Sequence, residues 1–363
     1  MTFGRSDIVY LELSSRIKKQ VLAGDLKDRV PSEKELAQKY GVNFKTVNKA
    51  ISTLVGEGIL YRVRGKGAFI KKDAHRNLQS SVRTIGLAVF NLQWLNNPFY
   101  SEILAGIGEV VQKNGHNLQF LTTNKNLGEA HRNLYYMDAW QQGKFDGMII
   151  AGEEVDENDI AKLSSKKFPF VLLGKHLPKR KINLVGIDNF KGGYDAAMHL
   201  INLDHKCIAF IPGNNYKTDK ERIAGCKEAM KNAKLKLDKK YIKPGYFEEK
   251  KAYQAMQELL KLTPRPTAVI ASDDIMAASA MQAVKDAGLS VPGEISVIGF
   301  NDILLASKLT PALTTLKIPL YEMGKTTTEI LGKRLLDFSI PPKRVIFPPQ
   351  LVIRGSTGRA LNK

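Results

Sequence analysis

The hydrophobic positions of the first 72 residues predict three short helices followed by a hairpin. An amphipathic first helix is predicted from apolar residues at every fourth position: Leu13, Ile17 and Val21. Gly24 ends this helix. Ser32 and Glu35 have the spacing of a capping box, in which each side chain bonds the backbone of the other residue. They begin a second helix, which stops at Gly41.

A third helix begins after Asn43, whose side chain can cap it. One side of this helix carries an apolar stripe: Val47, Ala50, Ile51 and Leu54. The opposite side carries Lys45, Asn48 and Lys49. Two strands, at 59–64 and 68–70, flank a turn formed by Gly65, Lys66 and Gly67. Two helices joined by a tight turn and followed by such a hairpin predict a winged helix–turn–helix.

From residue 84 onward, short apolar strands alternate with helical patterns. The predicted strands are 85–90, 118–121, 147–151, 170–173, 207–211, 268–271 and 296–299. This alternation predicts an α/β domain in which helices cover both faces of parallel sheets. The polar, basic stretch before it has no periodicity and predicts a linker. We therefore expect a DNA-binding domain at 1–72, a linker at 73–83 and a second domain at 84–363.

The charge distribution indicates a polyanionic partner for the first domain. The chain has a net charge of +19. Residues 1–72 hold fifteen Lys or Arg against seven Asp or Glu. The net positive charge per residue is nearly three times higher there than in the rest of the chain. The third helix fits a major groove, and the hairpin reaches the flanking phosphates. The candidate DNA contacts are Ser32, Lys45, Thr46, Asn48, Lys49, Arg62, Arg64, Lys66 and Gly67. The alternative is a three-helix core with a solvated polar face.

Other classes of protein find little support in the sequence. The N-terminus lacks an apolar stretch of signal-peptide length, and no window approaches 18 apolar residues, so we expect a cytoplasmic protein without membrane contact. Cys207 and Cys226 form no metal-spaced set. Met323 to Thr326 resemble the end of a phosphate-binding loop, but Pro319 stands where its first glycine belongs. No nucleophile elbow or zinc-protease motif occurs, and we expect no enzymatic activity, metal or cofactor.

The first domain closely resembles the head of the GntR family of repressors over about 65 residues. The matching positions are Pro31, Ser32, Glu33, Leu36, Ala37, Gly41, Val42, Thr46, Val47, Leu54, Gly58, Arg62, Gly65, Gly67 and Phe69. The family usually has Arg at the places of Phe44 and Asn48, and both places face DNA in the family. The resemblance therefore implies an operator that differs from the family's common one.

The remainder, from about Arg83 to Thr357, resembles the effector domain of the LacI/GalR family, which shares its fold with periplasmic sugar-binding proteins. The resemblance rests on 97–100, 188–193, Arg222 with Gly225, 271–277, 297–302, 313–315 and 351–357. A GntR head on this domain is similar to the arabinose-repressor group. The resemblance implies two α/β lobes with a ligand cleft at the carboxyl ends of their strands.

This resemblance also implies the residues that bind the ligand. It gives Arg222 the role of gripping two hydroxyls, and it places Asp273 and Asp274 at the family's ligand-binding Asn-Asp pair. Phe247 aligns with an aromatic residue that packs over the sugar, and Asn301 follows a strand end at the cleft. Other roles stay open: Arg222 on a helix surface, Asp273 as a helix cap, and Phe247 in the core.

The first lobe contributes further candidates to the same cleft. Phe99 and Tyr100 follow the first strand, although Phe99 equally fits packing within the lobe. Lys175 follows Gly174 where the family commonly has a ligand-binding Asp. Lys175 and Glu153, which follows the strand at 147–151, are therefore candidates to compensate for the missing carboxylate.

Together these features predict a repressor that binds a palindromic operator as a homodimer through its effector domains. A small sugar, L-arabinose or a related one, would close the cleft and lower DNA affinity. A ligand that promotes DNA binding is the first alternative, and a sugar-binding module without DNA control, such as a transport receptor, is the second. An α/β enzyme with a basic accessory domain is the third.

Overall fold

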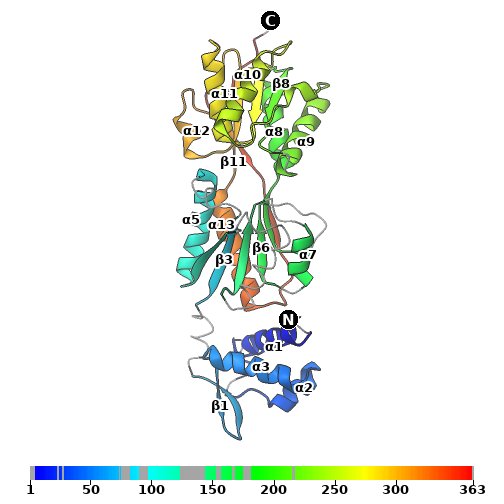
Figure 1. Ribbon diagram of the computed structural model, residues 1–363, viewed down its shortest axis with the longest axis vertical. Helices are drawn as coiled ribbons and strands as arrows, with labels where there is room; N and C mark the ends of the chain where they lie inside the picture. The colour runs from blue at the N-terminus through cyan, green and yellow to red at the C-terminus, as the bar shows by residue number, and fades with distance from the viewer. Residues whose placement is uncertain are drawn as a thin grey trace.

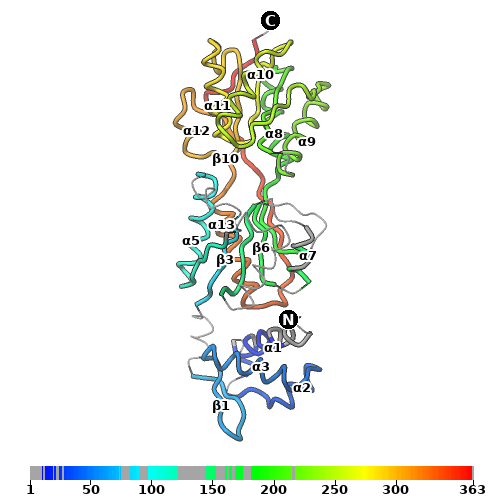
Figure 2. Tube along the Cα trace, viewed as in Figure 1, coloured from blue at the N-terminus to red at the C-terminus, as the bar shows by residue number. Residues whose placement is uncertain are grey.

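The structure is a computed structural model, and it describes residues 5–22, 24–26, 28–72, 74, 82–89, 97–122, 144–152, 157–165, 168–174, 181–214 and 217–361. Three bodies follow one another along the long axis (Figure 1): a helical head and two α/β lobes. The C-terminus lies at the end of the molecule opposite the head, as the backbone trace also shows (Figure 2). No described helix combines the length and hydrophobicity needed to cross a membrane.

The head has the predicted winged helix–turn–helix fold. Its elements are α1 (Arg5–Leu22), α2 (Glu33–Tyr40), α3 (Phe44–Gly56), β1 (Leu60–Val63) and β2 (Gly67–Ile70). The capping box of Ser32 and Glu35 is present, and Gly41 ends α2 with a left-handed φ of 63°. Asn43 caps α3. The apolar faces of α1 and α3 form one buried core, as the periodicity predicted.

The hairpin forms the wing, and its second strand is supported from the other side. Val30 donates its N–H to Ala68, and Ile70 donates its N–H to Asp28, so the segment before α2 runs beside β2. Ala74, which the predicted linker includes, is fully buried in the core of the head. The packing of the head therefore extends two residues beyond the predicted boundary at 72.

The first lobe is a six-stranded parallel sheet in the order β12-β7-β6-β5-β3-β4. Its strands are β3 (Thr84–Val89), β4 (Asn117–Thr122), β5 (Gly147–Ala151), β6 (Phe170–Leu173), β7 (Leu184–Ile187) and β12 (Arg344–Phe347). Residues of α5 (Pro98–Lys113) and α13 (Leu320–Leu336) pack on one face of the sheet. Residues of α7 (Glu157–Ser165) pack on the other face.

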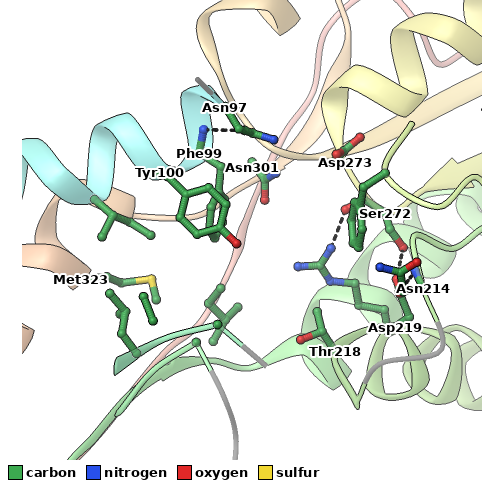
Figure 3. Close-up of a pocket in the computed structure, with 18 of the residues that line it drawn as sticks. Asn97, Phe99, Tyr100, Asn214, Thr218, Asp219, Ser272, Asp273, Asn301 and Met323 are labelled. Carbon is green, nitrogen blue, oxygen red and sulfur yellow. Dashed lines mark hydrogen bonds between the residues drawn. The ribbon is translucent and has the colours of Figure 1, made fainter. Parts of the chain in front are cut away.

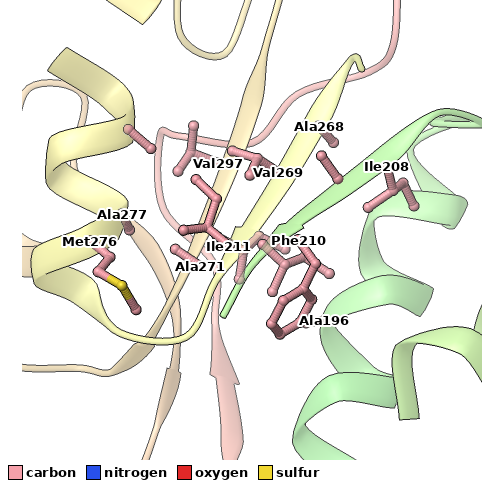
Figure 4. Packing of buried hydrophobic residues seen from close by; sticks show 14 of the residues in the cluster. Ala196, Ile208, Phe210, Ile211, Ala268, Val269, Ala271, Met276, Ala277 and Val297 are labelled. Carbon is pink, nitrogen blue, oxygen red and sulfur yellow. The ribbon is translucent and has the colours of Figure 1, made fainter. Parts of the chain in front are cut away.

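The second lobe is a five-stranded sheet in the order β13-β11-β10-β9-β8, in which only β13 is antiparallel to its neighbour. Its strands are β8 (Ile208–Ile211), β9 (Ala268–Ala271), β10 (Ser296–Asn301), β11 (Thr314–Lys317) and β13 (Gln350–Val352). Its helices are α8 (Asn189–Asn202), α9 (Lys217–Asn232), η2 (Lys239–Tyr241), α10 (Glu249–Leu260), α11 (Asp274–Asp286) and α12 (Leu304–Lys308). Their apolar sides meet the sheet around Phe210, Val269 and Met276 (Figure 4).

The chain passes between the lobes three times. It leaves the first lobe after β7, returns after β11 to form α13 and β12, and leaves again to form β13. Each predicted strand is present to within two residues at either end. Four strands were not predicted, and they are β7, β11, β12 and β13. All four flank the crossings, so the sequence predicted the two lobes but not how the chain joins them.

Candidate functional site

α3 and the wing carry all the predicted DNA contacts except Ser32, which caps α2. Lys45 and Lys49 are exposed on α3. The Lys49 ammonium lies 4.3 Å from the ring centroid of Tyr10 on α1. Arg64 and Lys66 are exposed at the turn of the wing beside Gly67. Figure 1 shows this wing pointing away from both lobes.

Besides Ser32 in its capping box, three predicted contacts take part in side-chain hydrogen bonds within the head. The side chain of Asn48 donates to the carboxylate of Glu33 over 3.3 Å. Arg62 donates to the same carboxylate over 3.1 Å and to the backbone oxygen of Asn48. Thr46 is buried, and its hydroxyl donates to the side chain of Asn43. The bonds of Arg62 hold the wing against α2 and α3, the bond of Asn48 joins α3 to α2, and the bond of Thr46 lies within the cap of α3.

A cavity of about 560 Å³ lies between the two lobes. Its wall from the first lobe includes Asn97, Phe99, Tyr100, Ile103, Ala151, Gly152, Leu173, Gly174, Ile187 and Met323. The wall from the second lobe includes Asn214, Thr218, Asp219, Arg222, Tyr246, Phe247, Glu248, Ser272, Asp273 and Asn301. Figure 3 shows the rings of Phe99 and Tyr100 on one side, with Asp219, Ser272 and Asp273 across from them. Carboxylates, amides and aromatic faces around one cavity suit a polyhydroxylated ligand.

Arg222 is 4% exposed, so it is a buried cavity residue and not a helix-surface arginine. Its Nε donates to the side chain of Asn189 over 3.0 Å, and its Nη1 donates to the backbone oxygen of Ser272 over 2.5 Å. Its guanidinium carbon lies 4.2 Å from the ring centroid of Phe300. A Cβ added to Gly193 would lie 1.9 Å from the backbone oxygen of Arg222, so this glycine allows α8 and α9 to pack closely.

Asp219 is a cavity residue that the sequence analysis missed. It is 1% exposed and lies one turn before Arg222 on α9. Its carboxylate accepts the backbone N–H groups of Gly213 and Asn214 and the hydroxyl of Ser272. The signal was its spacing of three from Arg222, which puts both side chains on one side of a helix. Asn97, Asn214, Thr218, Tyr246 and Ser272 also line the cavity and were not among the predicted ligand contacts.

Phe247 lines the cavity with 41% of its surface exposed, so it is not a core residue. Tyr246 and Phe247 both adopt the left-handed conformation with φ of 57°. The Phe247 ring rests against Gly213, where an added Cβ would lie 2.1 Å from the ring. The backbone that Asp219 holds is therefore also the support for Phe247.

The two adjacent carboxylates Asp273 and Asp274 have different positions. Asp273 lines the cavity and also caps α11 by accepting the N–H of Met276, so both readings of this residue apply. Burial raises the pKa of Asp273 to about 6. Asp274 is fully buried away from the cavity lining, and it accepts the hydroxyl of Thr315 and the N–H of Ile303. Burial raises its pKa to about 7.

The remaining predicted ligand contacts divide into two groups. Phe99, Tyr100 and Asn301 line the cavity, and the rings of Phe99 and Tyr100 meet edge to face at 5.0 Å. Glu153 and Lys175 lie outside the described residues. Among the described residues, no three His, Cys, Asp or Glu side chains are grouped to hold a metal ion.

The fold and the two sites define a DNA-binding regulator with a periplasmic-binding-protein-like sensor. Residues 6–70 match the model of bacterial regulatory proteins of the gntR family, and residues 197–357 match that of the periplasmic binding protein-like domain. A ribose operon repressor of Haemophilus influenzae is 30% identical over 331 residues, which cover 89% of this chain and 97% of that protein. An arabinose metabolism transcriptional repressor of Geobacillus stearothermophilus is 26% identical over 96% of this chain and 97% of the relative.

Solved structures agree with these relatives. A LacI family transcriptional regulator from Enterococcus faecium with bound ribose is 28% identical, with a TM-score of 0.67 over 76% of this chain and 99% of that chain. The regulator CelR in complex with cellobiose is 25% identical, with a TM-score of 0.69 over 90% of this chain and all of that chain. The chain belongs to the LacI/GntR-type transcriptional repressors, with a GntR head on a LacI-type effector domain.

Proposed function

We propose that this repressor binds a small sugar in the cavity between its lobes and then releases its operator. L-arabinose is the first candidate, since the relatives named for arabinose metabolism match almost the whole chain, head included. The observation that carries the proposal is the position of Arg222, a buried guanidinium on a cavity lined by aromatic residues from both lobes. Its planar fork can hold two neighbouring hydroxyls, which the ammonium of a lysine cannot do.

The route from cavity to DNA follows from the architecture. A ligand that contacts both walls of the cavity draws the lobes together, because its contacts are complete only in the closed state. The head is attached to the first lobe. The hydroxyl of Ser15 on α1 donates a hydrogen bond of 3.3 Å to the backbone oxygen of Leu336 at the end of α13. A changed angle between the lobes of a homodimer would change the spacing of two heads on a palindrome. Operator affinity would then fall, with a coupling of about 1–3 kcal/mol.

The ligand can be identified by a thermal-shift screen of pentoses, hexoses and their phosphates. A ligand at a hundred times its dissociation constant stabilises the folded state by about 2.7 kcal/mol, which raises the melting temperature measurably. The sugar found should then weaken operator binding in a fluorescence-anisotropy titration. A sugar that strengthens operator binding would instead show that the ligand acts as a co-repressor.

Arg222→Ala tests the site itself. We expect the variant to bind operator like the wild type but not to respond to the sugar, since losing one partner of a buried charged contact costs about 2–5 kcal/mol. The variant should also melt lower, because Asn189 and Ser272 lose their donor. Lys227→Ala, which removes an exposed positive charge from the same helix, is the matched control. Release of operator by Arg222→Ala at the wild-type sugar concentration would show that the proposed ligand site is wrong.

A further inference from the structure

An exposed aromatic ring stands at the start of the helix that is expected to enter the major groove. Phe44 is the first residue of α3, and 58% of its surface is exposed. Its side chain is thus largely excluded from the apolar core of the head, which α3 fills with Val47, Ala50, Ile51 and Leu54. In the helix–turn–helix geometry, the N-terminal residues of the second helix are those that contact base edges.

The polar residues that follow Phe44 on α3 are largely committed to the head itself. The hydroxyl of Thr46 is bound to Asn43, and the amide of Asn48 is bound to Glu33. The ammonium of Lys49 lies over the ring of Tyr10. Phe44 and Lys45 are the exposed pair in the first turn, with Lys45 able to reach phosphates or a guanine.

The chemistry of the ring limits what it can recognise. A phenyl group neither donates nor accepts a conventional hydrogen bond, so it cannot distinguish bases by their donors and acceptors. The apolar group that a base pair presents in the major groove is the C5-methyl of thymine. Burial of Phe44 against that methyl removes apolar surface of both partners from water, which favours thymine over cytosine and over uracil.

We propose that Phe44 is a specificity-determining residue that reads the methyl group of a thymine in each operator half-site. This inference rests on the proposed operator binding and adds the chemical feature that one position of α3 recognises. It assigns Phe44 a direct base contact, whereas Thr46 and Asn48 hold the helix and wing in place.

The experiment starts from an operator isolated by selection of random duplexes with the full-length protein. Each thymine of that operator is then replaced by deoxyuracil, which lacks only the methyl group. We expect one position per half-site at which the wild type loses affinity about fourfold, the factor that corresponds to burial of one methyl group. Phe44→Ala should bind the thymine and uracil operators equally and keep the salt dependence of the wild type, because the phosphate contacts are unchanged.

Two controls make the result specific. Phe44 is exposed, so Phe44→Ala should melt like the wild type, and Leu304→Ala, which removes an exposed side chain from the effector domain, should keep the full uracil effect. Uracil sensitivity that persists in Phe44→Ala, or its absence in the wild type on a selected operator, would overturn the inference and leave the proposed function standing. A selection that yields no preferred duplex would overturn both.

Discussion

Asp274 shows how one residue's surroundings decide its role. Its neighbour Asp273 reaches the cavity, but the two oxygens of Asp274 accept hydrogen bonds from Thr315 on β11 and from Ile303, which precedes α12. Unlike Asp273, Asp274 is not among the residues that line the cavity. Its environment therefore assigns it to the stability of the second lobe, with consequences that can be measured.

Asp274 should make the folded protein less stable as the pH rises. Its folded pKa of about 7 lies above the ordinary value of 3.8 because of burial, so the folded state holds a proton that the unfolded state has lost. The stability contribution is therefore present at low pH and is lost between about pH 4 and pH 7. The substitution Asp274→Asn keeps a side chain of nearly the same shape but removes the titrating carboxyl group. We expect its melting temperature to rise relative to that of the wild type as the pH goes from 4 to 8.

The comparison between these two proteins removes the contribution of groups that titrate alike in both. His205 is buried, and burial lowers its pKa, so it opposes Asp274 by favouring folding at higher pH in the wild type and the variant alike. A constant difference in melting temperature across the pH range would contradict the prediction.

Single residues also show how far the sequence could predict the cavity. Arg222, Phe247, Asp273 and Asn301 were found through motifs that carry them close to strand ends or along α9. Asp219 was not found, because its importance lies in bonds to Gly213, Asn214 and Ser272, which only the folded loop brings to it. Sequence motifs identify residues that face the cavity. They are less informative about residues such as Asp219 that fix the backbone of the cavity wall.

Among the elements, α3 depends on its N-terminal cap. Asn43 accepts the backbone N–H of Thr46 over 2.8 Å and also its hydroxyl. We expect Asn43→Ala to lower the stability of the head by about 1 kcal/mol, the usual cost of a lost cap. Fraying of this first turn should also weaken binding to all DNA sequences, because Phe44 and Lys45 belong to it. Denaturation of the full-length protein and operator titrations would measure both effects.

Asn43→Ser distinguishes the capping role of Asn43 from a direct contact of its side chain with DNA. Serine caps a helix about as well as asparagine, so this variant should keep both stability and DNA binding. A loss of DNA binding in Asn43→Ser without a loss of stability would show that Asn43 itself contacts DNA.

Burial and hydrophobic pattern explain which strands could be predicted from the sequence. The strands at 147–151, 170–173 and 268–271 were predicted at their observed bounds, because they are wholly buried and read as continuous apolar runs. β12 and β13 are edge strands of half-exposed residues, and β11 is rich in threonine, so hydrophobicity alone did not reveal them. β7 is buried as well, but Gly186 interrupts its apolar run.

At the scale of the whole molecule, the proposed mechanism requires two copies. A palindromic operator matches a two-fold protein, and we expect light scattering at micromolar concentration to give twice the mass of one chain without DNA. Addition of the sugar should leave this mass unchanged but reduce the radius of gyration as the lobes close. A monomer with and without ligand would contradict the prediction, and the head variant Asn43→Ala should remain a dimer as the matched control.

The three crossings between the lobes have a consequence for biosynthesis. Every described residue in the core of the head lies at or before Ala74, so this core can form as soon as one contiguous segment has left the ribosome. The first lobe can fold completely only after α13 and β12 have been synthesised. The second lobe also needs β13 and Ala360, which donates its N–H to the backbone oxygen of Leu203. On each nascent chain, the part that binds DNA is therefore finished well before the part that regulates it. A message truncated between the two would encode the head without the domain that holds the proposed sugar site.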